Sequence, residues 1–281
     1  MKAQKKNFTG NDSDLESYQL VSALDEVPLW TAPFAYPLLD RIEYKRHCTL
    51  LDIGYGTGFP ILELAMRLGS SGTVHGIDPW QMGTQRAAEK AEVYGIKNII
   101  FATGHAEKLP YAKSTFDTVV SNNGINNVTS IPQVLSEVAR VLKPGGQFVF
   151  TMNTEKSFEE FYEVYRQVLT EFRLEMYHEK ITEHIYMKRR PEPEMVSMVE
   201  DAGFRIVDIG RNSFQYRFAD GNALFDHFFI RIGFLGPWKS ILPVEHRDKV
   251  FARIGELLNQ KAEGKGLVFT VPFLVFDTRK I

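Results

Sequence analysis

The sequence predicts an α/β fold, a doubly wound sheet of mostly parallel strands with helices on both faces. Between residues 49 and 152, short apolar runs of strand length alternate with segments that are apolar at helical spacing. Strict alternation of strand and helix is typical of a parallel sheet with right-handed crossovers. A glycine-rich turn follows the first strand, and a carboxylate ends the second. Both features lie where such sheets bind ligands, outside the carboxyl ends of the strands.

The first strand, its turn and the helix behind it are read from the local pattern. Thr49–Ile53 is a short apolar run with the length of a buried parallel strand. Phe59–Leu68 is apolar at helical spacing, and Gly69 is placed to end that helix. Between them, glycine stands at every second position, at Gly54, Gly56 and Gly58. Glycines let the backbone turn tightly and let a ligand approach, so the pattern favours an adenosine-bearing ligand. A tight turn without a ligand is the alternative.

Two details of the turn favour a cationic ligand over a dinucleotide. The spacing is G-x-G-x-G, because Phe59 stands where a dinucleotide fold has its third glycine. Asp52 precedes the first glycine by two positions, and its carboxylate would oppose a pyrophosphate but suits a positive charge. A nicotinamide-dependent oxidoreductase on a similar sheet is therefore the weaker alternative. A non-catalytic nucleoside-binding module is a second alternative, since a fold does not determine a function.

The second strand, Thr73–Asp78, ends at the position where βαβ units bind ribose. Asp78 lies 20 positions beyond Gly58. A carboxylate there can accept hydrogen bonds from both ribose hydroxyls, and an exposed loop aspartate is the alternative. Pro79 and Trp80 follow directly, and the indole of Trp80 could lie along an adenosine.

The remaining elements follow in chain order. We expect further helices at 15–24, 36–42, 83–94, 131–142, 158–177 and 191–202, and further strands at 98–103, 116–123, 147–152, 204–218 and 266–279. Residues 178–190 form a polar segment, and 219–263 are expected to form a helical insertion. We predict a disordered tail at 1–14 and a single domain at 15–281, with a cofactor-binding core at 45–152. The segments at 15–44, 176–190 and 219–263 are expected to form the substrate-side lid and insertion.

The composition is that of an ordinary soluble globular enzyme. Of 281 residues, 44% are hydrophobic and 24% are charged. The formal charge of −2 shows no basic excess, which argues against a nucleic-acid groove. Cys48 is the only cysteine, so we expect no disulfide within the chain and no thiolate metal cluster. No helical segment carries paired metal ligands at the usual spacing, so no metal is expected.

The sequence shows no targeting or membrane segment. The amino terminus lacks the apolar core of a signal peptide. No window approaches the roughly 20 apolar residues needed to span a bilayer. We therefore predict a cytoplasmic protein without stable membrane insertion, and the sequence leaves a homo-oligomer open.

Four ordered segments resemble those of class I S-adenosylmethionine-dependent methyltransferases. They are Leu51–Gly58, Gly76–Asp78, Ala106–Pro110 with Phe116–Asp117, and Leu142–Gly146. The resemblance covers roughly residues 47–152, a little over a third of the chain. Residues 121–127 resemble the branch that methylates small molecules, such as the quinone and sterol methyltransferases. The family implies a Rossmann-like, seven-stranded sheet whose last strand is antiparallel. It also implies S-adenosyl-L-methionine as cofactor and S-adenosyl-L-homocysteine as product.

The same resemblance implies a set of cofactor-binding residues. The glycines would pass beneath the methionine and ribose parts, Asp52 would lie near the amino-acid end, and Asp78 would hold the ribose. The full set is Asp52, Gly54, Tyr55, Gly56, Gly58, Asp78, Pro79, Trp80, His105, Ala106, Glu107, Asn122 and Asn123. His105 and Ala106 would meet the adenine, although the family usually has an aspartate where His105 stands. A neutral imidazole can also accept a hydrogen bond, or the role passes to Glu107 or to a backbone oxygen.

The acceptor is expected to be a small, partly apolar molecule. Candidate acceptor-binding residues are Trp30, Tyr186, Phe225, Phe228 and Phe229. Ordinary core packing is the alternative for these aromatic side chains. A general base is needed only if the nucleophile must lose a proton, and the candidate bases are His184, Tyr186 and His227. For each histidine, a surface or core position without catalytic role is the alternative.

Overall fold

The computed structural model describes residues 17–18, 21–22 and 29–281. The predicted tail at 1–14 and most of the helix predicted at 15–24 lie outside the described residues. The chain divides into two compact units. The sheet unit contains residues 29–155, 188–212 and 272–281, and the helical unit contains residues 156–187 and 213–271.

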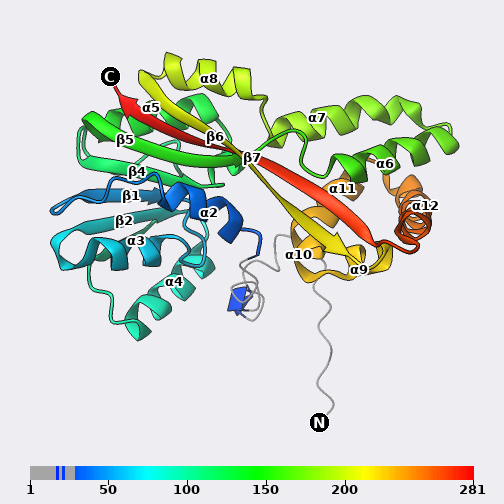
Figure 1. The fold of residues 1–281 in the computed structure, drawn as a ribbon, viewed down its shortest axis with the longest axis horizontal. Coiled ribbons are helices and arrows are strands. Elements are labelled where there is room, and N and C mark those ends of the chain that lie inside the picture. Colours follow the sequence, from blue (N-terminus) through cyan, green and yellow to red (C-terminus); the bar gives the residue numbers. More distant parts are fainter. Residues whose placement is uncertain (1–16, 19–20, 23–28) are drawn as a thin grey trace, which may run out of the picture. The chain divides into compact units, whose positions relative to one another are not determined.

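A single seven-stranded sheet has the order β3-β2-β1-β4-β5-β7-β6 (Figure 1). The strands are β1 (Thr49–Ile53), β2 (Thr73–Asp78), β3 (Ile99–Thr103), β4 (Phe116–Asn122), β5 (Leu142–Asn153), β6 (Phe204–Phe218) and β7 (Leu267–Lys280). Strands β1 to β5 pair in parallel, whereas β7 pairs antiparallel with β5. The predicted fold class is confirmed. The carboxyl ends of β1, β2 and β4 share one edge, where the glycine turn begins.

The helices of the sheet unit flank the strands. They are α2 (Ala32–Leu39), α3 (Ile61–Leu68), α4 (Gln81–Val93), α5 (Ile131–Val141) and α8 (Glu192–Asp201), with short 3₁₀ turns η2 (Gly69–Ser71) and η3 (Ile125–Asn127). Glycines in the left-handed region follow α3 and α8, at Gly69 (φ +58°) and Gly203 (φ +87°), as the sequence predicts. Helix α2 begins at Ala32, earlier than the predicted residue 36, because Pro33 fits the first turn of a helix, where no N–H is needed.

The core of the sheet unit lies between the central strands and helices α5 and α8. Helix α5 buries Val134, Leu135 and Val138 at helical spacing. The ring of Phe150 on β5 stacks on that of Phe276 on β7, with centroids 4.6 Å apart. The central strands are therefore buried, and a polar side chain on one of these strands is costly unless it has a hydrogen-bond partner or a ligand.

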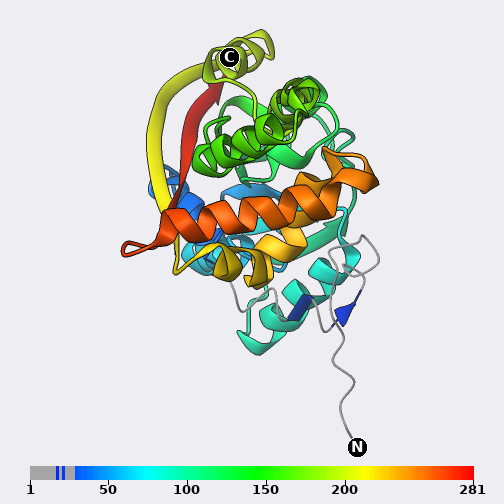
Figure 2. The same cartoon turned by 90° about the vertical axis from the view of Figure 1, so that its right-hand side faces the viewer.

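The helical unit is built around aromatic side chains. Its elements are α6 (Glu159–Glu171), η4 (Glu175–Tyr177), α7 (His178–Lys188), α9 (Gly221–Asp226), α10 (Phe228–Ile230), the π-helix η5 (Arg231–Leu235), α11 (Gly236–Ser240) and α12 (Val244–Ala262). Helix α12 packs along α9 and α6 (Figure 2). The indole of Trp238 stacks on Phe161 at 3.9 Å and donates a hydrogen bond to Tyr162 Oη at 3.1 Å.

Two boundaries here differ from the sequence prediction. Helix α6 ends at Glu171 rather than near residue 177, because Arg173 takes a left-handed conformation (φ +57°). The segment 178–190, which the sequence marks only as polar, is helical over most of its length. Among the helices of the described residues, none combines the length and the apolar character that a membrane crossing needs.

Candidate functional site

The glycine turn after β1 has a backbone conformation that depends on glycine. Gly54, Gly56 and Gly58 have φ angles of +80°, +54° and +111°, a region that residues with a Cβ rarely adopt. A Cβ added to Gly56 would meet no atom within 4 Å. A Cβ added to Gly54 would lie 3.3 Å from the Cα of Gly124, which follows β4. The backbone of the turn is therefore open to a ligand at Gly56 and closely packed at Gly54.

Asp78, at the end of β2, holds this turn in place. Its Oδ2 accepts the N–H of Gly56 at 2.9 Å, and its Oδ1 accepts the N–H of Trp80 at 2.7 Å. The side chain is almost fully buried, which raises its pKa, while the two N–H bonds oppose that shift. Each carboxylate oxygen can accept more than one hydrogen bond, so a ribose hydroxyl can still be bound. The structural role of Asp78 was not predicted from the sequence.

Asp52, on β1, is a buried carboxylate with an exposed fraction of 0%. Within the part of the chain that the structure describes, neither of its oxygens has a hydrogen-bond donor. Burial raises its pKa well above the usual value, and the nearby charge of Asp78 raises it further. A partnerless buried carboxylate is costly, and a ligand that carries a positive charge would relieve the cost. The turn therefore fits a cationic ligand, as the sequence suggests.

The side chain of Tyr55, within the turn, is buried. Its hydroxyl lies 2.7 Å from Thr84 Oγ1 in α4, and its ring packs 5.4 Å from that of Phe101. A Cβ on Gly76 would lie only 2.6 Å from the Tyr55 ring. Burial raises the pKa of Tyr55 to about 12. Its side chain is thus part of the core, and Tyr55 contributes its backbone to the turn.

Trp80 and Pro79 begin the segment that leads into α4. A Cβ on Gly83 would lie 2.6 Å from the indole of Trp80 and 3.0 Å from the carbonyl oxygen of Gly56. The indole therefore packs closely on the first turn of α4, near the glycine turn. Pro79 is exposed. A contact between Trp80 and an adenosine stays a prediction.

The predicted adenine-side residues follow β3. His105 is exposed, and its carbonyl oxygen accepts the N–H of Lys108 at 3.2 Å. Ala106 is buried in the core of the sheet unit. Glu107 Oε1 accepts the N–H of Thr129 at 2.7 Å, just before α5. Glu107 thus fixes the loop ahead of α5, and which of these groups meets the adenine stays a prediction.

Asn122 and Asn123, at the end of β4, belong to a network of polar side chains. Asn122 donates to the carbonyl oxygen of Thr31 at 3.1 Å and accepts from Thr151 Oγ1 at 3.2 Å. Asn123 N–H donates to the same Thr151 oxygen at 2.9 Å. The hydroxyl of Thr151 thus links the two predicted residues, a role that no local sequence signal indicates.

Asn126 and Asn153 extend this network. Asn123 Oδ1 accepts from Asn126 Nδ2 at 2.9 Å and from the N–H of Asn153 at 3.2 Å. The backbone donor identifies that atom of Asn123 as oxygen, so the atom of Asn126 that faces it is nitrogen. Asn126 Oδ1 is then left buried without a partner. Asn126 lies inside the polar run 121–127 but was not among the predicted site residues.

The acceptor-side candidates occupy aromatic surroundings. In the sheet unit, Trp30 packs on Phe34 with ring centroids 5.3 Å apart. In the helical unit, Phe225 lies 6.1 Å from Phe251, and Phe229 lies 5.7 Å from Phe234. These contacts agree with core packing, and a role for Phe225, Phe228 and Phe229 in acceptor binding stays a prediction.

The three candidate bases differ in environment. The ring of His227 lies 6.0 Å from Tyr216 and 5.5 Å from Phe218, and burial lowers its pKa. His184 lies 6.4 Å from the ring of Tyr162. Tyr186 is 42% exposed. His227 is thus held neutral by its apolar surroundings, which suits a base but equally suits a core residue.

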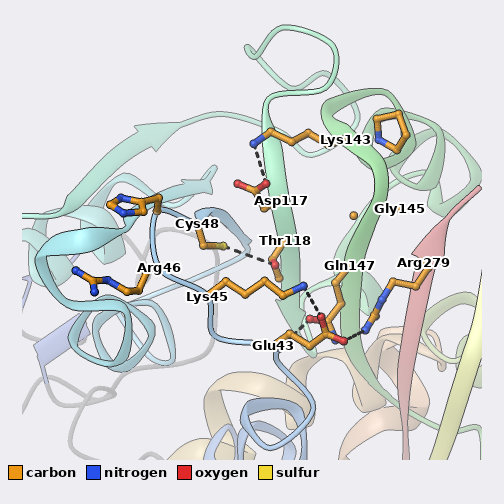
Figure 3. A pocket seen from close by; sticks show the side chains of 13 residues that line it. Glu43, Lys45, Arg46, Cys48, Asp117, Thr118, Lys143, Gly145, Gln147 and Arg279 are labelled. Atoms are coloured by element: carbon orange, nitrogen blue, oxygen red, sulfur yellow. Dashed lines mark hydrogen bonds and ion pairs between the residues drawn. The ribbon is translucent and has the colours of Figure 1, made fainter.

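A cavity lies at the opposite, amino-terminal ends of the strands (Figure 3). This cavity of about 260 Å³ is lined by charged side chains and by Cys48. Lys143 is ion-paired with Asp117 at 2.7 Å, and the buried thiol of Cys48 lies 3.8 Å from Thr118 Oγ1. Burial raises the pKa of that thiol. None of the predicted cofactor residues lines this cavity.

Comparison with known proteins places the chain in a family. Residues 44–203, more than half of the chain, match a family described as methyltransferase domain. A demethylmenaquinone methyltransferase of Lactococcus lactis is 27% identical over 229 residues, covering 79% of this chain and 86% of that protein. An arsenite methyltransferase of Aquipseudomonas alcaligenes is 31% identical over 160 residues, covering 50% of this chain and 46% of that protein.

Solved structures share the fold at lower identity. The YcgJ protein of Bacillus subtilis superposes with a TM-score of 0.57 at 17% identity, covering 89% of this chain and 98% of that one. The [4+2]-cyclase SpnF superposes with a TM-score of 0.53 at 17% identity, covering 98% of this chain and 84% of that one. The family match and the order of the motifs decide against the nicotinamide alternative. The chain belongs to the class I S-adenosylmethionine-dependent methyltransferases.

Proposed function

We propose that this methyltransferase binds S-adenosyl-L-methionine over the glycine turn and transfers its methyl group to a small, partly apolar molecule by in-line displacement. The observation that carries the placement is the carboxylate of Asp52, which is fully buried and has no donor among the residues that the structure describes. The cofactor bears positive charge on its ammonium and sulfonium groups, so it would supply the missing partner. The open backbone at Gly56 offers the space for its approach.

Each predicted residue then has a role in holding the cofactor. Asp52 would face its positively charged part, and Asp78 would accept from the ribose hydroxyls while holding Gly56 N–H. The methionine and ribose parts would be lined by Gly54, Gly56, Gly58 and the backbone of Tyr55. The adenosine would be lined by Pro79, Trp80, His105, Ala106 and Glu107. The sulfonium would lie near Asn122 and Asn123. The hydrogen bonds of Asn122 and Asn123 to Thr151 support this role, because they hold the two residues in position before the ligand arrives.

The chemistry needs little from the protein beyond position. When bound, the cofactor supplies a methyl group that is already activated by its sulfonium. The residues around it orient the acceptor in line and exclude water. A general base is required only if the nucleophile loses a proton during transfer, and His184, Tyr186 and His227 are the proposed candidates.

The class of acceptor is inferred from the relatives. The names of two relatives point to demethylmenaquinone, a quinone, and to arsenite, and both are small molecules. The higher share of the chain is covered by the demethylmenaquinone methyltransferase. This supports a small acceptor with apolar character, bound by aromatic side chains such as Trp30, Tyr186, Phe225, Phe228 and Phe229.

A calorimetric titration with S-adenosyl-L-homocysteine tests the placement of the cofactor. We expect binding in the micromolar range, about 7–8 kcal/mol. Asp248→Ala serves as a control for aspartate substitutions in the turn. It changes an exposed aspartate of α12 and should leave binding unchanged. Absence of binding to the wild-type protein would contradict the proposal. Metabolite extracts incubated with isotopically labelled methyl donor would then identify the acceptor, and transfer only to macromolecules would contradict a small-molecule substrate.

A further inference from the structure

We propose that binding of the cofactor is coupled to the loss of a proton from Asp52. In the ligand-free enzyme the Asp52 carboxyl holds a proton, and a cationic group of the bound cofactor takes that proton's place. The inference deepens the proposed function, on which it rests, because it states how the same site accepts a positively charged ligand.

The position of Asp52 makes its ionisation costly without a ligand. It lies on β1 in the middle of the sheet, opposite Gly76 on β2 and Val120 on β4. Both of these neighbours lack a side-chain hydrogen-bond donor, and both oxygens of Asp52 are buried with no partner in the described ranges 17–18, 21–22 and 29–281. An isolated carboxylate in such surroundings keeps its proton rather than its charge.

The other titratable groups around Asp52 do not offset this cost. Asp78 at the end of β2 acts on Asp52 through its charge and favours the protonated form. The phenol of Tyr55 lies within the field of both carboxylates and is itself kept protonated by burial. His75 of β2 is one position from Gly76, so it faces the other side of the sheet, where it packs against the rings of Tyr111 and Phe116. Among the described residues, no cationic side chain offsets this effect on Asp52.

The exchange balances in atoms and charge. On binding, the O–H bond of the Asp52 carboxyl breaks and the proton passes to the solvent. The carboxylate that remains accepts N–H donors from the ammonium group of the cofactor, or faces its sulfonium. S-adenosyl-L-homocysteine retains the ammonium group, so it serves as a stable probe.

Titration of the full-length protein with S-adenosyl-L-homocysteine in two buffers measures the released proton. Phosphate and Tris differ in ionisation enthalpy, so the difference in binding heat counts protons. We expect release of close to one proton per site at low pH, declining as the pH rises. Over the same range the affinity should rise with pH, by up to about tenfold per pH unit, until Asp52 ionises in the free protein.

Two variants assign the proton. Asp52→Asn should bind more weakly, without proton release and with an affinity that does not vary with pH. Asp78→Asn is the matched control, because Asp78 already accepts two backbone N–H bonds; it should bind more weakly but still release a proton. If Asp52→Asn binds too weakly to titrate, the pH dependence of the wild-type affinity decides alone.

The outcomes separate this inference from the proposed function. Equal binding heats in the two buffers at every pH, after correction for dilution, would overturn the inference while leaving cofactor binding intact. Proton release from Asp52→Asn equal to that of the wild type would also overturn it. A wild-type protein that binds no S-adenosyl-L-homocysteine at any pH would overturn both.

Discussion

Charged side chains have opposite environments at the two ends of the parallel strands. At the carboxyl ends, Asp52 and Asp78 are buried, and neither has a cationic partner among the side chains of the described residues. At the amino ends, Glu43 is ion-paired with Lys45 at 2.8 Å and with Arg279 at 2.5 Å (Figure 3). The pKa of Glu43 is lowered by these partners, whereas burial raises the pKa of both aspartates.

The difference separates charges that serve the fold from charges that await a ligand. An exposed ion pair is satisfied within the protein and contributes about 0–1 kcal/mol. A buried carboxylate without a partner lowers the stability of the free protein. Such a group is retained where a bound ligand offsets its destabilising effect. The raised pKa values of the buried aspartates mark the carboxyl edge of the sheet as the ligand-binding edge.

Removing one aspartate at each edge of the sheet should have the largest and most unequal effects on ligand affinity. Asp78→Ala should weaken binding of S-adenosyl-L-homocysteine by about 1.5–3 kcal/mol, the scale of a hydrogen bond to a charged group. The N–H groups of Gly56 and Trp80 would also lose their acceptor. Asp117→Ala removes the partner of Lys143 at the other edge and should leave the affinity unchanged. Calorimetric titration of both variants measures this, and equal losses of affinity would refute the distinction between the edges.

Asp52→Asn should stabilise the ligand-free protein as the pH rises. Because the folded-state pKa of Asp52 is raised, its contribution to stability is fully present below the unfolded-state pKa of about 3.9 and is lost as pH rises through the folded value. The amide does not ionise, so the variant should gain on the wild type toward neutral pH, by on the order of 1–3 kcal/mol. Urea unfolding at several pH values measures the free energy of unfolding.

The same variant should lose its advantage when the ligand is present. Saturating S-adenosyl-L-homocysteine stabilises the protein by an amount that grows with the logarithm of its affinity, and the wild type is expected to bind it more tightly. An Asp52→Asn protein that is less stable than the wild type at neutral pH without ligand would contradict the prediction.

Local signals in the sequence predicted most of the sheet unit. Strand β2 has the predicted bounds, because an apolar run that ends in an aspartate before proline needs no tertiary information. The ends of α3 and α8 were likewise marked by Gly69 and Gly203. The predicted start of helix α2 was displaced to residue 36, since the prolines within the helix, Pro33 and Pro37, also suit a loop.

The site itself was predicted only in outline. Asp52 and Asp78 were identified from their distance to the glycines, but that distance does not show that Asp78 holds Gly56 or that Asp52 lacks a donor. The contact of Asn123 with Thr151 joins residues 28 positions apart. Such contacts depend on the pairing of β4 with β5, which brings the two strand ends together, and no local pattern records them.

Glu43→Gln, at the amino-terminal edge of the sheet, should have the smallest effect on stability. The lowered pKa of Glu43 means that its ion pairs stabilise the protein above its usual pKa of about 4.3 and lose that effect as the pH falls through the lowered value. The side chain is 49% exposed, so solvent screening should limit the loss to about 0.2–1 kcal/mol. Because exposed ion pairs are screened by salt, the difference between variant and wild type should shrink at high salt. Thermal unfolding at low and high salt measures it, and a loss above this range that persists in high salt would show that this edge carries more than surface ion pairs.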